Sequence, residues 1–286
     1  MPKATTEAQG HGFIRFALIV SVVFAVLWLA WFFYQRYAGK KHPNRNAGIT
    51  ANDTPSPYPL PSGERIKVRG DLQVNMLLMR LVVGPLQVNC FIVADEKTKE
   101  AVVIDPGDDA AEILKLINDK GLKVKYIVNT HGHFDHVGAN KAVKEATGAE
   151  LLIHEADAQL MASAASHSSM FGMKPVSSPP ADRFVKDGEM ITAGEIELKV
   201  VYTPGHSLGG ISLLGQGIAF TGDSLFAGSI GRTDFPGGDL KTLLRSIKKN
   251  LLTLPDDTKV FSGHGPASTI GDERNENPFL NDQSGF

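Results

Sequence analysis

Residues 131–136 read His-Gly-His-Phe-Asp-His, and this motif constrains the fold more than any other part of the chain. It directly follows an apolar run, residues 125–129, that predicts a β-strand. Alternate residues of an extended segment point the same way, so the first two histidines share one side. The turn that follows brings Asp135 and His136 to a second position. Imidazoles and carboxylates are ligands for zinc, iron and manganese, so the motif predicts a metal centre at a strand end.

Three further ligand-type residues follow strand-like runs, each beside a glycine. They are His206 in Thr-Pro-Gly-His-Ser, Asp223 in Thr-Gly-Asp-Ser and His264 in Ser-Gly-His-Gly-Pro. Glycine allows close approach of the backbone, and the carboxyl ends of strands in open α/β sheets are common ligand sites. One such residue alone is weak evidence. Four strand-end motifs in one region predict a single shared site.

Strand-like and helix-like segments alternate from Met76 onward, which predicts an α/β layered domain without an internal repeat. The Ser- and Pro-rich residues 164–180 are expected to form a loop near the site. The expected strands are 76–83, 90–94, 101–104, 125–129, 151–153, 195–201, 210–214, 218–220 and 259–262. The expected helices are 110–120, 138–147, 155–163 and 240–250.

Charge and cysteine content exclude some classes of protein. The 29 Lys and Arg residues and 31 Asp and Glu residues leave a net charge of −2, so the broad basic field of a nucleic-acid-binding protein is missing. The one cysteine, Cys90, excludes an intrachain disulfide framework and a cysteine-based zinc knuckle. We expect Cys90 to pack as a small buried hydrophobic residue rather than to act in redox chemistry.

The N-terminal part of the chain has a different character. Residues 16–34 carry no charge and are almost wholly apolar, long enough for a transmembrane helix within an N-terminal region 1–37. Basic residues are more numerous after this run than before it, which predicts a single-pass protein with its catalytic domain on the cytoplasmic side. Residues 38–75 are Pro-rich and predict a disordered linker. If translation starts near Met76 instead, the protein would be cytoplasmic.

The order His-x-His-x-Asp-His, His, Asp, His resembles the metallo-β-lactamase superfamily over about residues 76–280. The stretches GDSLFAGSIGRTDFPGGD and GHGPASTIGDERNENPF resemble its compact glyoxalase II-like group, the hydroxyacylglutathione hydrolase relatives. The resemblance implies an αββα sandwich over residues 76–286 that binds two divalent ions, with zinc expected and iron or manganese also compatible. It further implies these ligands: His131, His133 and His206 for metal one, Asp135, His136 and His264 for metal two, and Asp223 bridging both.

This resemblance implies that the protein would be a thioester hydrolase acting on S-lactoylglutathione or a similar small acyl-thiol. A hydroxide bridging the metals would attack the carbonyl, with Asp135 as a catalytic residue that orients the nucleophile. Aspartate at position 223, where well-known β-lactamases have cysteine, argues against antibiotic hydrolysis. The alternative is a persulfide dioxygenase of the same fold, which would need one iron held by His131, His206 and Asp223. The oligomeric state is left open.

Three other residues have weaker signals. Arg232, in Gly-Arg-Thr-Asp-Phe, is a candidate to bind a substrate carboxylate, or it forms a structural pair with Asp234 or Asp239. Only about twenty residues follow His264, so we expect the helical extension that helps larger glyoxalase II enzymes to bind glutathione to be absent, which leaves a glutathione site open. We expect His154 to cap or support a turn, and Asp105 to form a turn at a strand end and support the metal loop.

Overall fold

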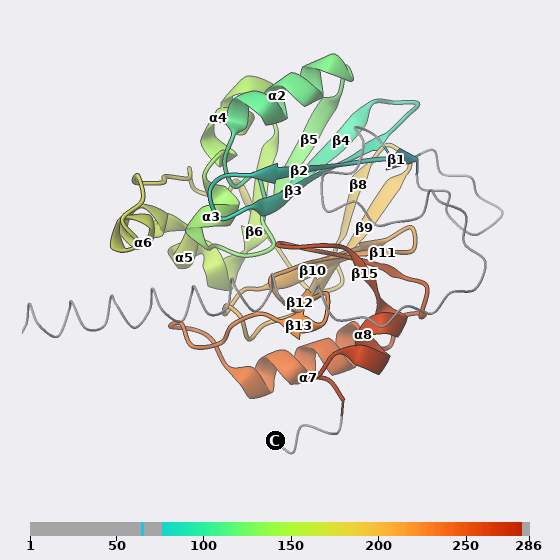
Figure 1. Ribbon diagram of the computed structural model, residues 1–286. Coiled ribbons are helices and arrows are strands. Elements are labelled where there is room, and N and C mark those ends of the chain that lie inside the picture. The colour runs from blue at the N-terminus through green and yellow to red at the C-terminus, as the bar shows by residue number, and fades with distance from the viewer. Residues whose placement is uncertain (1–63, 66–75, 282–286) are drawn as a thin grey trace, which may run out of the picture. The chain divides into compact units, whose positions relative to one another are not determined.

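Two β-sheets pack face to face, with helices on both outer sides, in the computed structural model of residues 64–65 and 76–281 (Figure 1). The first sheet has the order β1 (Glu64–Arg65), β2 (Met76–Val83), β3 (Val88–Asp95), β4 (Glu100–Ile104), β5 (Lys123–Val128), β6 (Glu150–His154) and β7 (Arg183–Val185). The second has the order β15 (Ser268–Thr269), β14 (Lys259–Ser262), β11 (Ile218–Gly222), β10 (Ile211–Gly215), β9 (Ile196–Tyr202) and β8 (Met190–Ala193). A hairpin joins β12 (Leu225–Phe226) to β13 (Ser229–Ile230).

The helices are short, and most of them cover the outer faces of the sheets (Figure 1). They are α2 (Ala110–Asp119), α3 (Phe134–Val137), α4 (Asn140–Thr147), η1 (Glu155–Asp157), α5 (Ala158–Ala162), α6 (Ala164–Met170), α7 (Leu240–Asn250) and α8 (Ile270–Glu276). The α7 helix shows how local sequence defines its ends. Asp239 caps its first turn by accepting a hydrogen bond from the Thr242 amide, and Lys248 and Lys249 lie in its last turn, near the negative end of the helix dipole.

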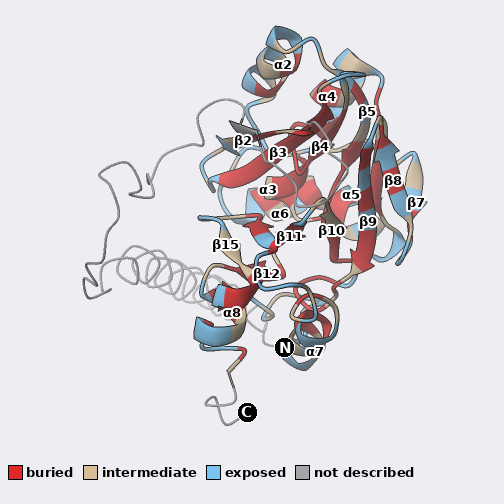
Figure 2. Cartoon of the chain, turned by 90° about the vertical axis from the view of Figure 1, so that its right-hand side faces the viewer, coloured by how far each residue is buried: buried red, intermediate tan, exposed pale blue. Residues whose placement is uncertain are grey.

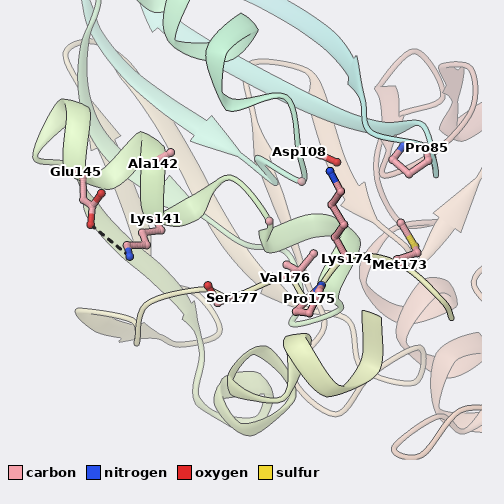
Figure 3. Close-up of a pocket in the computed structure, with 12 residues that line it drawn as sticks. Pro85, Asp108, Lys141, Ala142, Glu145, Met173, Lys174, Pro175, Val176 and Ser177 are labelled. Atoms are coloured by element: carbon pink, nitrogen blue, oxygen red, sulfur yellow. Dashed lines mark ion pairs between the residues drawn. The ribbon is translucent and has the colours of Figure 1, made fainter. Parts of the chain in front are cut away.

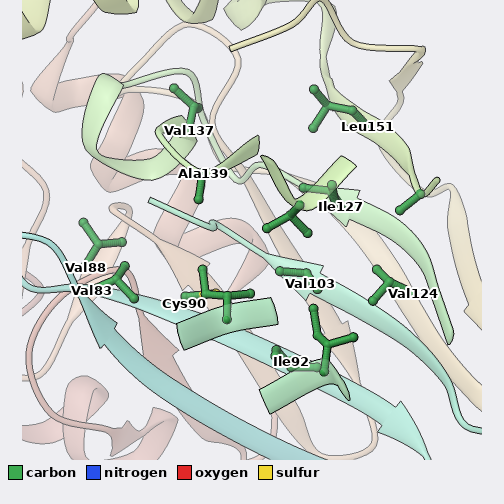
Figure 4. Close-up of a cluster of buried hydrophobic side chains, with 14 of the residues drawn as sticks. Val83, Val88, Cys90, Ile92, Val103, Val124, Ile127, Val137, Ala139 and Leu151 are labelled. Carbon is green, nitrogen blue, oxygen red and sulfur yellow. The ribbon is translucent and has the colours of Figure 1, made fainter. Parts of the chain in front are cut away.

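Three apolar layers hold these elements together, and β3 contributes to two of them. Its even-numbered residues, such as Ile92, pack toward α2 and α4 (Figure 4). Its odd-numbered residues face the second sheet, where the Phe91 and Phe220 ring centroids lie 5.1 Å apart. Leu243 and Ile247 of α7 pack on the outer face of the second sheet. Figure 2 shows the buried strands enclosed by partly exposed helices, an αββα sandwich.

Strand direction brings the candidate site residues to one edge. β10 is antiparallel to both β9 and β11, and β11 is parallel to β14, so the carboxyl ends of β9, β11 and β14 lie at the same edge of the second sheet. The first sheet meets this edge where β5 ends, because the Ile211 amide donates a 2.9 Å hydrogen bond to the Thr130 carbonyl. The four strand ends that precede the ligand-type residues therefore converge.

Several expected elements differ from the structure. Residues 164–180 are not all loop, because 164–170 form α6, whose Ala164 and Ser168 are buried. The expected helix 138–147 is α4, which begins at Asn140, and a separate short helix, α3, begins before it inside the histidine motif at Phe134. The expected helix 155–163 is a 3₁₀ turn followed by α5. The short elements β7, β8, β12, β13, β15 and α8 have too little periodicity to be predicted from the sequence.

The membrane helix predicted at residues 16–34 lies outside the described residues, and so does most of the predicted linker 38–75. Two residues of that linker, Glu64 and Arg65, form β1 and pair with β2. Within residues 64–65 and 76–281, no helix has the length and apolar character needed to cross a membrane. The domain boundaries stay predictions.

Asp95, at the end of β3, stabilises the sandwich at a position away from the converging ends of β5, β9, β11 and β14. This buried carboxylate accepts hydrogen bonds from the amides of Lys97, Thr98 and Glu195, and so joins two turns. Burial alone would raise its pKa, but the three amides outweigh that effect and lower the pKa.

Asp95→Asn is expected to lower the free energy of unfolding by about 1–3 kcal/mol at pH 7, because the new amide nitrogen faces backbone donors. A carboxyl group with a lowered pKa stabilises the native state above its unfolded pKa of about 3.9, and this contribution is lost as the pH falls further. The difference between wild type and variant should therefore shrink below about pH 4. Urea unfolding at several pH values measures it, and a pH-independent difference would contradict this assignment.

Candidate metal centre

Seven side chains, all from segments that follow strands, meet at the shared edge of the two sheets. The segment after β5 supplies His131 and His133, and its first helical turn, in α3, supplies Asp135 and His136. The segments after β9, β11 and β14 supply His206, Asp223 and His264. Every ligand-type residue singled out from the sequence is thus part of one cluster.

The cluster has two parts. The ring nitrogens of His131, His133 and His206 lie within 4.8 Å of one another, and His133 Nδ1 is 2.9 Å from His206 Nε2. The donor atoms of Asp135, His136 and His264 form a second set within the same limit. In that set, His264 Nε2 is 3.3 Å from His136 Nε2 and 3.4 Å from Asp135 Oδ2. Each set groups three donor atoms closely enough to surround one cation.

Asp223 lies between the two sets. Its Oδ2 is 3.7 Å from His206 Nε2 of the first set and 3.6 Å from His264 Nε2 of the second. Its Oδ1 is 3.5 Å from His136 Nε2. One carboxylate therefore contacts both sets, as a bridging ligand would.

The donor atoms fit a pair of divalent cations. Ligands about 2.0–2.2 Å from a tetrahedral zinc ion are roughly 3.3–3.6 Å apart, close to most of the separations between donor atoms in the cluster. Among the described residues, His131 Nε2 and Asp223 Oδ1 are buried without a hydrogen-bond partner. An unpartnered buried polar atom is costly, and a bound cation would remove that cost at both positions.

Outer hydrogen bonds orient four of the five imidazoles. His136 Nδ1 lies 3.1 Å from Asp105 Oδ2, and His131 Nδ1 lies 3.1 Å from Thr130 Oγ1. In each of these rings the other nitrogen, Nε2, is the one directed into the cluster, an arrangement typical of metal-binding histidines. His206 and His264 complete the pattern, because their Nδ1 atoms contact the carbonyl oxygens of Arg232 and Leu86 at 2.8 and 3.1 Å.

Two glycines permit this close packing. A Cβ atom at Gly263 would lie 2.2 Å from Asp223 Oδ1 and 2.7 Å from His136 Cε1. Gly222 has a φ of +48°, and a Cβ atom there would lie 2.3 Å from Thr130 Oγ1. The glycines next to the ligand residues in the sequence therefore provide space for the cluster itself.

Charge is distributed unevenly over the two sets. Burial and the neighbouring histidines hold the pKa of His131 far below its usual range, and burial and His206 lower that of His133 to about 3. Burial also opposes a charge on His136, but Asp223, Asp135 and Asp105 outweigh it and raise its pKa to about 10. His131 and His133 are therefore neutral at pH 7, the form in which imidazole binds a metal.

The other residues singled out from the sequence lie as follows. Arg232 donates to both oxygens of Asp234 and stacks on Phe235 at 3.7 Å, so the pairing alternative is the arrangement seen. His154 caps η1 by accepting a hydrogen bond from the Ala156 amide, which confirms its capping role. Cys90 is fully buried, and burial raises the pKa of its thiol, as expected for a residue that serves packing.

Sequence reasoning missed Asp157 and understated Asp105. Asp105 accepts hydrogen bonds from the amide and hydroxyl of Thr130 as well as lying against His136. Asp157 bonds to Gly132, Ser207 and Gly209, at sequence separations of 25 to 52 residues. No local pattern reveals such contacts, because Asp157 lies in what reads as an ordinary helix start.

A separate cleft of about 650 Å³ lies between α4 and residues 173–177 (Figure 3). Lys141 and Lys174 line it, together with the acidic residues Asp108 and Glu145. None of the seven clustered side chains lines this cleft. The chemistry of the protein is therefore argued from the cluster and not from the cleft.

Comparison with known proteins agrees with this geometry. Residues 83–264 match the family model described as the metallo-beta-lactamase superfamily. The chain is 40% identical over 206 residues to the hydroxyacylglutathione hydrolase GloC of Haemophilus influenzae, covering 71% of this chain and 97% of that protein.

Solved structures show the same fold. BLEG-1, described as a B3 metallo-beta-lactamase, is 39% identical, with a TM-score of 0.67 and coverage of 71% of this chain and 99% of its own. TTHA1623, solved in a di-iron-bound form, is 38% identical, with a TM-score of 0.66 and coverage of 71% and 100%. ETHE1 from Myxococcus xanthus is 29% identical, with a TM-score of 0.59 and coverage of 70% and 83%. With its αββα sandwich and clustered His and Asp side chains, the chain belongs to the metallo-β-lactamase superfamily of metal-dependent hydrolases.

Proposed function

We propose that this protein is a glyoxalase II-like thioester hydrolase that uses two divalent metal ions, with zinc expected. The observation that carries the proposal is the pair of three-donor sets with the Asp223 carboxylate between them. The 40% identity to a hydroxyacylglutathione hydrolase over almost the whole of that protein supports a small acyl-thiol such as S-lactoylglutathione as the substrate.

The ligand assignment follows the two sets. His131, His133 and His206 would hold one ion, Asp135, His136 and His264 the other, and Asp223 would bind both. When bound, two such ions lower the pKa of a water molecule and stabilise negative charge that develops on a carbonyl oxygen. The chain's own contribution is to hold these donors in place and to exclude bulk water from three of them, His131, His136 and His206.

Asp135 is proposed to orient the attacking water as well as to bind metal. Burial opposes its charge, but His136 and His264 outweigh burial and lower the pKa of Asp135, so it is a carboxylate at neutral pH. A carboxylate oxygen accepts a hydrogen bond from water and thereby fixes its direction of attack. The departing thiolate needs little help, because a thiol has a pKa near 8.5, far below that of an alcohol.

A second candidate function is a persulfide dioxygenase with a single iron. The similarity to ETHE1 favours it, and His131, His206 and Asp223 could supply two imidazoles and one carboxylate to one iron. The di-iron-bound form of TTHA1623 supports iron as the metal, but with two ions and not one. The two functions differ in their reagents, because hydrolysis consumes water and the dioxygenase consumes oxygen.

Full-length protein loaded with zinc is expected to cleave S-lactoylglutathione, because two metal ions and Asp223 can activate water beside a thioester carbonyl. Loss of the thioester absorbance measures the reaction, and prior removal of metal with a chelator should abolish it. An oxygen electrode with glutathione persulfide and iron-loaded protein tests the dioxygenase. Oxygen uptake with an inert thioester would replace the first function by the second.

Two controls sharpen this assay. Asp135→Asn should reduce turnover at least tenfold, and a variant with full turnover would remove the proposed role of Asp135. A chromogenic cephalosporin is the matched competing substrate, because BLEG-1 is described as a β-lactamase. Faster cleavage of the cephalosporin than of the thioester would contradict the proposed substrate class.

Arg232 is retained as a proposed contact for a substrate carboxylate, although it pairs with Asp234. Arg232→Ala is expected to raise KM for S-lactoylglutathione about tenfold with little change in kcat, because a charged hydrogen bond would be lost. The His206 contact uses the backbone carbonyl of residue 232, so the substitution leaves it in place. Steady-state kinetics decide the point, and an unchanged KM would leave Arg232 with a structural role only.

We also propose that residues 16–34 tether the protein to a membrane, with the catalytic domain on the cytoplasmic side. The uncharged run and the excess of basic residues after it support this proposal. Nucleic acid is not an expected partner, because the net charge is −2.

Full-length protein expressed in cells is expected to sediment with membranes and to need detergent for release, because the apolar run is long enough to span the hydrocarbon layer. Fractionation with carbonate washing measures this, and a chain that starts at Met76 is the control. Full-length protein in the soluble fraction would contradict the tether and favour a translation start near Met76.

A further inference from the structure

Asp157 is a buried carboxylate that serves neither set of candidate ligands directly. It is 1% exposed and lies at the end of η1, after β6. Its Oδ2 accepts hydrogen bonds from the Gly132 amide at 2.9 Å and from Ser207 Oγ at 2.7 Å. Its Oδ1 accepts one from the Gly209 amide at 2.6 Å. In the part of the chain that the structure describes, no cationic side chain forms an ion pair with it.

The three donors belong to two loops that carry the first ligand set. Gly132 lies between His131 and His133 in the loop after β5 of the first sheet, whereas Ser207 follows His206 in the loop after β9 of the second sheet. The two loops are about seventy residues apart in sequence and come from different sheets. Asp157 therefore connects the two halves of the three-histidine set.

The fit around Asp157 leaves no room for a side chain at Gly132 or at Gly209. A Cβ atom at Gly132 would lie 2.7 Å from the Asp157 carbonyl oxygen, and one at Gly209 would lie 2.6 Å from the Asp157 amide nitrogen. Both loops are thus held directly against residue 157. The Asp157 contact therefore joins the two loops beside the 2.9 Å approach of His133 Nδ1 to His206 Nε2, in addition to the hydrogen bond from the Ile211 amide to the Thr130 carbonyl.

The second ligand set has other supports. His136 is oriented by Asp105, and His264 by the carbonyl oxygen of Leu86. Asp135 and His136 lie in α3, three and four residues beyond the Gly132 amide that donates to Asp157. Loss of the Asp157 carboxylate should therefore disturb the two sets unequally.

We propose that Asp157 is a positioning residue that sets the separation of the His131–His133 loop from the His206 loop, and thereby the affinity of the three-histidine set for a divalent cation. This inference rests on the ligand assignment of the proposed function. An ionised carboxylate accepts three hydrogen bonds at once, whereas the amide of asparagine would direct N–H groups at a backbone donor or at the serine hydroxyl. Substitution should open the three-histidine set without removing any ligand.

The test is zinc binding by full-length Asp157→Asn after metal removal, followed by calorimetry with Zn²⁺ alone. Wild type is expected to bind two equivalents. The variant should retain one equivalent with nearly unchanged affinity and bind the other about 10–100-fold more weakly, the usual effect of losing an outer support. Two equivalents with wild-type affinities, or equal weakening of both, would overturn the proposal.

Asp95→Asn is the matched control, because Asp95 is equally buried and also accepts three hydrogen bonds across two turns, at the opposite end of β3 from the cluster. The melting temperature of metal-free Asp95→Asn should be lower than that of wild type, but both of its zinc affinities should be unchanged. A control that loses zinc affinity as Asp157→Asn does would show a general structural effect and overturn the positioning role.

A milder variant covers the case in which Asp157→Asn does not fold. Ser207→Ala removes one of the three hydrogen bonds and should weaken one zinc equivalent about fivefold; unchanged binding would then overturn the proposal. If wild type binds a single equivalent, the two-metal assignment fails. In that event, a single site that binds zinc about tenfold more weakly in Asp157→Asn than in wild type would support the positioning role. An unchanged zinc affinity would overturn it.

Discussion

The buried cluster at the shared edge of the two sheets is tolerable only because outer hydrogen bonds hold most of its rings in place. Imidazoles and carboxylates removed from water lose their hydration, and burial without partners costs several kcal/mol per group. Four of the five rings regain one bond each, from Asp105, Thr130 and the carbonyl oxygens of Leu86 and Arg232. The inward atoms, including His131 Nε2 and Asp223 Oδ1, are thereby left for a cation.

Two buried carboxylates, Asp105 and Asp157, hold the loops that carry the two candidate ligand sets. Asp105 contacts Thr130 and His136, so it links the loop after β4 to the loop after β5 within the first sheet. Asp157 reaches across to the second sheet through Ser207 and Gly209. A buried hydrogen-bond network is stable only when each polar group in it has a partner. Loss of either carboxylate would therefore disturb the candidate ligands, although neither carboxylate belongs to the seven clustered side chains.

The likeness to GloC, BLEG-1, TTHA1623 and ETHE1 shows how one scaffold is associated with several differently described proteins. Function within such a superfamily depends on the site and its surroundings and not on the fold. The surroundings here include Arg232, which is already engaged by Asp234 and stacked on Phe235 close to His133. The residues around the cluster, such as Arg232 and Phe235, therefore determine the substrate class, whereas the donor set determines which metals fit.

Much of the candidate site could be predicted from the sequence, because its seven donors lie in short motifs beside glycines and directly after apolar runs. Those local signals suffice to predict α7 and β14 at their observed bounds as well as the order of candidate ligands from His131 to His264. They fail where contacts are distant. The α6 helix is stabilised by packing, with Ala164 and Ser168 buried and Phe171 against Phe134. The partners of Asp157 lie 25 to 52 residues away.

The sequence by itself determined which groups could bind a metal, because donor chemistry belongs to residue type. Only the tertiary structure decided how far apart those groups lie, because that distance depends on hydrogen bonds between loops of two different sheets.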